Sequence, residues 1–221
     1  MIGLMPNTAV GYSNNLTVSL VDSFTLGSSI GNLYQIPGVA FGAASTGREI
    51  FVVMSLHNNA GPVVTSGTIG GVTAQISGDR FALMRAIVPT GTSGTITINV
   101  SQQSNSGSVA VFSVTNRRNP NAAPTTIATL GTSFVTSFSI NNTYPINAVG
   151  LLGAITIAQS GSTAPNTTFS APYTKVARDT GSGFENYTGY LLPKTTSSGT
   201  RTFAGTFGMT AALGGKLFII E

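Results

Sequence analysis

The chain has 221 residues, of which 41% are hydrophobic and only 7% are charged, so Ser, Thr, Asn and Gly must supply most of its solvation. Ten basic and six acidic residues give a net charge of +4, but no basic tract or interleaved aromatic residues support binding to nucleic acid. The absence of cysteine excludes disulfides and thiolate metal sites.

The first residues set the expected compartment and domain plan. Residues 1–8 contain no basic segment and no apolar run long enough for export or a membrane span, so we expect cytoplasmic synthesis and no membrane association. Residues 1–16 show no strand or helix period, and we interpret them as an extended arm that reaches a neighbouring subunit. An edge strand and loop of the same domain are the alternative. For residues 17–221 we predict a single β-sandwich domain.

Short runs rich in Val, Ile, Phe and Thr recur about every ten residues between turn-forming residues, which is typical of antiparallel sandwiches. Apolar residues alternate cleanly in Thr95–Val100, which predicts a half-buried strand. The more continuously apolar run Glu49–Leu56 predicts a strand covered on both faces, and Pro37 confines its strand to an edge or bulge. The runs in the first half are Leu16–Leu26, Leu33–Phe41, Glu49–Leu56, Val72–Ser77, Phe81–Val88, Gly94–Val100 and Val109–Val114.

The second half repeats this pattern after a linker-like segment that contains Pro120 and Pro124. Because the two halves of a jelly roll exchange strands, we interpret residues 117–125 as a crossover inside one domain. Thr210–Leu213 predicts one helical turn at most, ended by Gly214 and Gly215. The fold class is therefore all-β: a jelly-roll-like antiparallel β-sandwich of about a dozen short strands. The later runs are Ser133–Ile140, Ala148–Ala158, Tyr173–Arg178, Asn186–Leu192, Thr200–Met209 and Lys216–Ile220.

The sequence offers little that could perform chemistry. The only histidine, His57, follows a strand in a polar loop, where solvation is the usual state. Asp179 and Glu185 are the closest acids in sequence, but their spacing misses the twelve-residue pattern of a calcium loop. A glycosidase needs two acids that face one sugar bond, and the sequence does not show such a pair. The segment Gly67–Gly71 lacks the lysine and helix of a phosphate-binding loop, so it predicts a turn. We predict no catalytic, cofactor-binding or metal-binding residues, and no enzymatic activity.

The charged residues are spread along the chain. Arg117 and Arg118 form the only basic pair, and we interpret them as a solvated loop after a strand. The neighbouring opposite charges Arg48-Glu49 and Asp79-Arg80 lie at strand boundaries, where a sandwich could bring one dipeptide near the other as a cross-strand pair. Five Asn-x-Ser/Thr sequons are expected by chance in a chain so rich in Asn and Thr; they begin at Asn15, Asn99, Asn141, Asn166 and Asn186.

Four segments carry a resemblance to a known kind of protein: Gly47–Val53, Ile69–Ala74, Ala86–Ile96 and Val109–Thr115. Over residues 47–116 they resemble a β-sandwich module of virion- and tail-associated structural proteins from tailed bacteriophages. The resemblance implies a structural part of the virion, made in the bacterial host cytoplasm, and it carries no catalytic residues. Since no heptad run encodes a fibre shaft, a capsid decoration or cement protein, a head-fibre subunit or a tail adaptor is favoured over a full tail fibre.

Two functions of different class remain open at this stage. The first is a homo-oligomeric virion subunit that contacts the major capsid protein or tail and portal-proximal proteins through uncharged faces, because stable interface cores are depleted of charge. The second is a module at a fibre tip that binds a host surface glycan through exposed aromatic residues. The candidates for that aromatic platform are Tyr12, Tyr34, Tyr144, Tyr173, Tyr187 and Tyr190. Half-buried strand packing is the alternative for these tyrosines.

Overall fold

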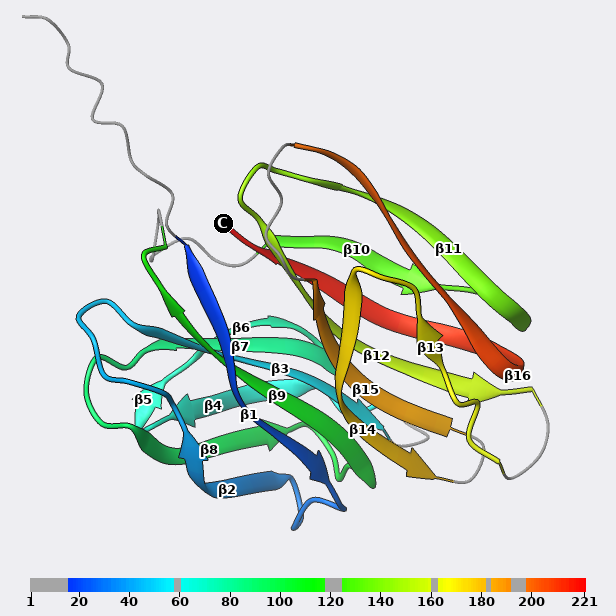
Figure 1. Cartoon of the computed structure of the whole chain (residues 1–221). Coiled ribbons are helices and arrows are strands. Elements are labelled where there is room, and N and C mark those ends of the chain that lie inside the picture. The colour runs from blue at the N-terminus through cyan, green and yellow to red at the C-terminus, as the bar shows by residue number, and fades with distance from the viewer. Residues whose placement is uncertain (1–15, 58–60, 118–124, 160–162, 182–183, 192–197) are drawn as a thin grey trace, which may run out of the picture.

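The computed structural model describes residues 16–57, 61–117, 125–159, 163–181, 184–191 and 198–221 and, for residues 125–128, 181, 190 and 191, the backbone alone. These residues form sixteen strands that pair antiparallel, and none of them is helical (Figure 1). The predicted fold class, an all-β antiparallel sandwich, is confirmed. None of the described residues belongs to a helix that could cross a lipid bilayer. The predicted arm at residues 1–16 lies outside the described residues except for Leu16, which is buried.

The strands of the first half form two sheets. They are β1 (Thr17–Leu26), β2 (Leu33–Ala40), β3 (Glu49–His57), β4 (Val64–Ile69), β5 (Val72–Thr73), β6 (Gln75–Gly78), β7 (Phe81–Ile87), β8 (Ser93–Val100) and β9 (Ser106–Thr115). Sheet A has the order β1-β9-β3-β7-β6 and sheet B the order β2-β8-β4-β5. Between them lies a first core that includes Val52 and Met54 of β3 and Ile96 and Ile98 of β8. The predicted alternation of β8 is confirmed, because Thr97 and Asn99, which lie between the buried Ile96, Ile98 and Val100, are only partly buried.

The strands of the second half form one curled sheet, sheet C. They are β10 (Thr125–Gly131), β11 (Val135–Tyr144), β12 (Val149–Ala158), β13 (Thr168–Phe169), β14 (Tyr173–Gly181), β15 (Phe184–Leu191) and β16 (Gly199–Ile220). The main order is β10-β16-β12-β15-β14, and β11 and β13 also pair with β16. A second core, rich in aromatic rings, lies inside the curl and includes Phe138, Tyr187 and Phe203.

The long strand β16 bends sharply, at the lower right of Figure 1, so that its two ends lie in different layers of the curl. Its partner on β11 shifts register at this point, from Val135 opposite Ala211 to Ser137 opposite Thr206. The predicted helical turn at Thr210–Leu213 is wrong, because this segment pairs with β12 and alternates between buried and partly buried residues. Gly215 does not end the strand: a Cβ there would lie 2.6 Å from the Cβ of Ala154, so glycine allows β12 and β16 to approach.

Sheet A is the middle layer of the molecule, because sheet C packs against the face that sheet B leaves open. A third core joins these sheets, with Phe51 and Phe112 from sheet A against Leu151 and Phe218 from sheet C. Strand β3 is therefore buried on both faces, as predicted. The expected exchange of strands between the halves is wrong for the described residues: strands before residue 118 pair only with one another, and so do those after residue 124. Residues 118–124 of the predicted crossover lie outside the described residues.

Candidate functional site

Glu49 lies at the start of β3 with its side chain fully buried, and two arginines bind the same carboxylate oxygen. Arg85 Nη1 and Arg117 Nη1 lie 3.3 and 3.2 Å from Glu49 Oε2. Arg85 also donates to Gln75 Oε1 on the neighbouring strand, and the Arg117 guanidinium lies 5.5 Å from the centre of the Phe51 ring. We call Glu49, Gln75, Arg85 and Arg117 the Glu49 cluster. The interpretation of Arg117 as a solvated residue is wrong; Arg118 lies outside the described residues.

Burial raises the pKa of the Glu49 carboxyl, and the nearby Arg117 and Arg85 offset this rise only in part. Burial also lowers the pKa of Arg117, against the attraction of Glu49. An acid with a raised pKa can serve as a proton donor. In the Glu49 cluster, however, both guanidinium groups bind Oε2, and Oε1 is buried with no hydrogen-bond partner among the described residues, so the carboxylate has no access to a substrate.

Arg48, next in the chain to Glu49, is fully buried and points to a different set of partners. Its guanidinium donates hydrogen bonds to backbone carbonyls alone: Nε to Val88 at 2.8 Å, Nη1 to Gly42 at 2.8 Å and Nη2 to Gly91 at 2.7 Å, with longer or additional bonds to Phe41 and Thr90. Guanidinium has five N–H donors in a fixed plane, which suits this arrangement. Arg48 therefore holds two loops at one end of the first sandwich.

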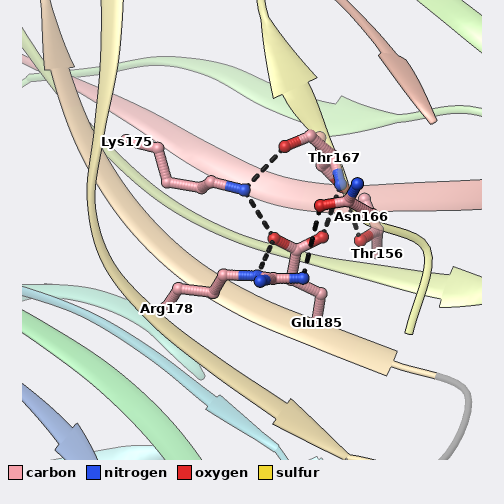
Figure 2. A network of polar contacts seen from close by, with 6 residues as sticks. All are labelled: Thr156, Asn166, Thr167, Lys175, Arg178 and Glu185. Carbon is pink, nitrogen blue, oxygen red and sulfur yellow. Dashed lines mark hydrogen bonds and ion pairs between the residues drawn. The ribbon is translucent and has the colours of Figure 1, made fainter. Parts of the chain in front are cut away.

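Glu185 on β15 is the centre of a second buried network, shown in Figure 2. Its Oε1 accepts hydrogen bonds from Lys175 Nζ at 2.6 Å and Arg178 Nε at 2.8 Å, and its Oε2 accepts from the Thr167 amide at 2.6 Å. Lys175 also donates to the Thr167 carbonyl. We call Thr167, Lys175, Arg178 and Glu185 the Glu185 cluster. Burial by itself would raise the pKa of Glu185, but the hydrogen bonds from Lys175 and Thr167 outweigh it and hold this pKa below its ordinary value.

Asp179 does not join Glu185. Its Oδ2 accepts a hydrogen bond from the Gly107 amide of β9 at 3.1 Å, on the side of β14 that faces sheet A. The two closest acids of the sequence thus bind different partners and do not converge on one ligand. Among the described residues, no group of three or more His, Cys, Asp or Glu side chains could hold a metal ion.

A buried polar contact fixes sheet C on sheet A. Ser55 Oγ on β3 donates to the Ala154 carbonyl of β12 at 2.7 Å and lies 3.0 Å from Asn186 Oδ1, while Asn186 Nδ2 donates to Ser106 Oγ on β9 at 3.0 Å. Nearby, a Cβ on Gly153 would lie 2.4 Å from the Met54 carbonyl oxygen, so the two backbones meet closely. The sequence alone pairs none of these residues, because they come from segments about a hundred positions apart.

His57 lies where the two halves meet, at the end of β3. Its ring packs against Phe184 of β15 at a tilt of 33°, with 4.2 Å between centroids, and it is partly buried. Burial and the positive charge of Arg80 lower the pKa of His57. The solvated loop predicted for this residue is therefore wrong, and its observed role is packing between the halves.

The cross-strand pair suggested between Arg48-Glu49 and Asp79-Arg80 is not formed. Asp79 Oδ2 instead lies 3.0 Å from Lys216 Nζ of β16, which adds an ion pair between sheets A and C. Arg80 lies over the Phe81 ring at 4.9 Å. The segment predicted as the turn Gly67–Gly71 begins inside β4, and only Gly70 and Gly71 turn the chain, both with positive φ.

The tyrosines proposed for a glycan platform are mostly core residues. Tyr34, Tyr144, Tyr173 and Tyr187 are all buried. The hydroxyl oxygens of Tyr144 and Tyr173 lie 2.6 Å apart, and burial together with this hydrogen bond raises the pKa of Tyr144. Tyr12 and the side chain of Tyr190 lie outside the described residues. For the four described tyrosines the alternative, strand packing, is confirmed.

The surface carries few charges because only 7% of the residues are charged and half of those pair with one another. Eight of the sixteen charged residues form intramolecular ion pairs, and Arg48 is bound by carbonyls. None of the four strands of sheet B contains an Asp, Glu, Lys, Arg or His residue. Its outer face carries Thr and Asn side chains bound to one another, such as Thr68 and Thr97 at 2.7 Å between hydroxyl oxygens. The most distinctive candidate site is therefore a broad uncharged surface.

Comparisons with protein-family models, with curated protein sequences and with solved structures find no match to this chain.

Proposed function

We propose that this chain is a non-enzymatic structural component of a bacteriophage virion: a capsid decoration or cement protein, a head-fibre subunit or a tail adaptor. It assembles as a homo-oligomer and with capsid or tail neighbours, through uncharged surfaces and through the arm at residues 1–16. The observation that carries this proposal is the outer face of sheet B, whose four strands contain no Asp, Glu, Lys, Arg or His.

Desolvation favours neutral side chains at an interface. When a charged side chain is buried at an interface without a partner, several kcal/mol of hydration are lost, as order-of-magnitude estimates indicate. Hydroxyl and amide groups lose less, because they pair readily with the same groups on a neighbour. A face such as that of sheet B can therefore be covered by another subunit at little cost. Such a face is suited to a subunit of a larger assembly.

The internal pairing of the charged residues argues against catalysis. Glu185 is occupied by Lys175, Arg178 and the Thr167 amide, and Glu49 by Arg85 and Arg117. A catalytic carboxylate needs access to a substrate proton or carbon. Neither of these acids has it in the described part of the chain. The resemblance of residues 47–116 to tailed-phage structural modules favours a virion over other assemblies.

The experiment is a comparison of phage particles made with and without this gene. We expect mass spectrometry to detect the protein in purified wild-type particles, and a difference map to show missing density at regularly repeated positions in the deletion particles. Purified protein added to deletion particles should restore that density. Identical particles with and without the gene would overturn the proposal.

The glycan-binding alternative finds no support in the described tyrosines, which are buried. Binding of the purified protein to a panel of bacterial surface glycans, together with particles that assemble fully without it, would favour that alternative over a structural role.

A further inference from the structure

Strands at the edges of sheets expose unpaired N–H and C=O groups, and natural proteins protect them against pairing with other chains. The usual devices are charged side chains, Pro, β-bulges and short strands. In this molecule the edges can be compared with one another, because all three sheets are open.

Most described edges carry at least one such device. Strand β1 has a bulge beside Asp22, β2 contains Pro37 within a register shift, and β5 and β6 have two and four residues. Strand β14 has a bulge and carries Lys175, Arg178 and Asp179. Strand β10 is interrupted by a bulge between Thr126 and Ala128.

Strand β11 shifts register only at its start, between Val135 and Ser137, and carries no such device over the rest of its length. From Ser137 to Tyr144 it keeps an unbroken register with β16, and it contains no charged residue, no Pro and no Gly. Within the described part of the chain it pairs only with β16, so its other edge has no partner there. Ser139, Asn141 and Thr143 are exposed along it. An edge of this length without protection is what pairing with another strand requires.

We propose that β11 pairs antiparallel with β11 of a second copy of this chain, about a two-fold axis. Three features favour a second copy as the occupant. A self-paired strand brings each residue near its own counterpart, so any charge would oppose a like charge, and β11 has none. Its exposed hydroxyl and amide side chains act as both donors and acceptors, so each can bond to its own type. An antiparallel two-fold contact also closes on itself, so it yields a dimer with no open edge on β11.

This inference deepens the proposed function by naming one subunit contact, and it can be tested without phage particles. Light scattering coupled to size-exclusion chromatography should give the full chain a mass twice its 22.5 kDa. Ser139→Lys and Ser139→Glu should each reduce that mass twofold, and an equal mixture of the two variants should restore it. Ser19→Lys is the matched control, since Ser19 is an exposed serine on the bulged edge β1; it should remain dimeric.

The absence of cysteine allows a second readout. Single-cysteine variants at positions 137, 139, 141 and 143 should form disulfide-linked dimers under mild oxidation, fastest for the position nearest the two-fold axis, whereas Ser19→Cys should not. A monomeric wild-type chain, or a dimer that persists in both Ser139→Lys and Ser139→Glu, would overturn the pairing. A β11 dimer that is absent from virions would leave the pairing intact and overturn the proposed function; a monomer that still joins virions would do the reverse.

Discussion

Arg48 illustrates, at the scale of single residues, how this chain uses its few charges. Its guanidinium is fully buried, and in the described part of the chain five carbonyl groups and no carboxylate accept its N–H donors. The carbonyls belong to two loops, at residues 41–42 and 88–91. Lysine has the same charge but only three donors on a single nitrogen, so it cannot reach carbonyls that are spread around a plane.

We therefore expect Arg48→Lys to lower the free energy of unfolding by about 3 kcal/mol or more, because buried carbonyls left without donors cost about 1 to 3 kcal/mol each. Urea denaturation followed by circular dichroism measures this loss. Arg80→Lys is the matched control: its described contact is the Phe81 ring, so it should cost no more than about 1 kcal/mol. Equal losses in the two variants would contradict the role given to Arg48.

Glu185 gives a prediction that depends on pH. Its pKa is lower in the folded protein than in the unfolded chain, so the ionised carboxylate stabilises the fold at pH values above the unfolded pKa. That contribution is lost as the pH falls through the folded-state pKa. Glu185→Gln should lower the free energy of unfolding at pH 7 by about 2 to 4 kcal/mol, since it leaves Lys175 without its buried anion.

The difference between wild type and Glu185→Gln should shrink in acid, because the wild-type carboxyl then takes up a proton. Urea denaturation at about pH 7 and about pH 3 tests this convergence. Arg178→Gln is the control: the Arg178 side chain is 42% exposed, so its loss should cost only about 0 to 1 kcal/mol. A difference between wild type and Glu185→Gln that is constant across the pH range would show that the charge of Glu185 does not stabilise the fold.

At the scale of strands, much of the fold could be predicted from the sequence. The sequence patterns of β3 and β8 predicted the correct strands and buried faces. A continuous apolar run indicates burial on both faces, and strict alternation indicates burial on one. The segment Thr210–Gly215 was misread because Ala and Gly are poor strand formers. This segment forms a strand because it pairs with β12, where Ala154 lies opposite Gly215 and leaves no room for a larger side chain. Tertiary pairing overrides local propensity at this position.

The two adjacent glycines of β16 provide a matched pair of variants. A Cβ on Gly215 would lie 2.6 Å from the Ala154 Cβ, whereas a Cβ on Gly214 would meet its nearest atom at 3.7 Å. Gly215→Ala should destabilise the protein by about 1 to 3 kcal/mol through overpacking. Gly214→Ala should be neutral or stabilise it by up to about 1 kcal/mol, because alanine restricts the unfolded chain. Thermal unfolding of the two variants measures the contrast, and a reversed order would argue against the observed register of β16.

At the scale of the whole molecule, sheets B and C pack against opposite faces of the middle sheet A. The sequence suggested a single domain, but it could not show which residues join the halves. The contacts between Ser55 and Asn186, and between Asp79 and Lys216, span 131 and 137 positions. The same limit explains the misreading of Arg117, whose partner Glu49 is 68 positions away. Contacts of this range leave no local pattern in the sequence.

If the third core makes one cooperative unit of the three sheets, calorimetry should show a single unfolding transition for the full chain. Two resolved transitions would mean that the halves unfold independently.

Asn186→Ala removes the amide between Ser55 and Ser106 and should lower the unfolding free energy by about 1 to 3 kcal/mol. Asn99→Ala, which removes an exposed hydrogen bond to Ser66, should cost less than about 0.5 kcal/mol.

The position of β16 affects how the chain emerges from the ribosome. The first core is complete once residue 111 has been made, so the first sandwich can form during translation. Strands β10, β11, β12 and β13 all require β16 as a partner, and β16 is translated after each of them. Translation at about 5 to 20 residues per second leaves these strands without that partner for several seconds. During this interval a nascent-chain chaperone would shield the unpaired edges and apolar faces of these strands.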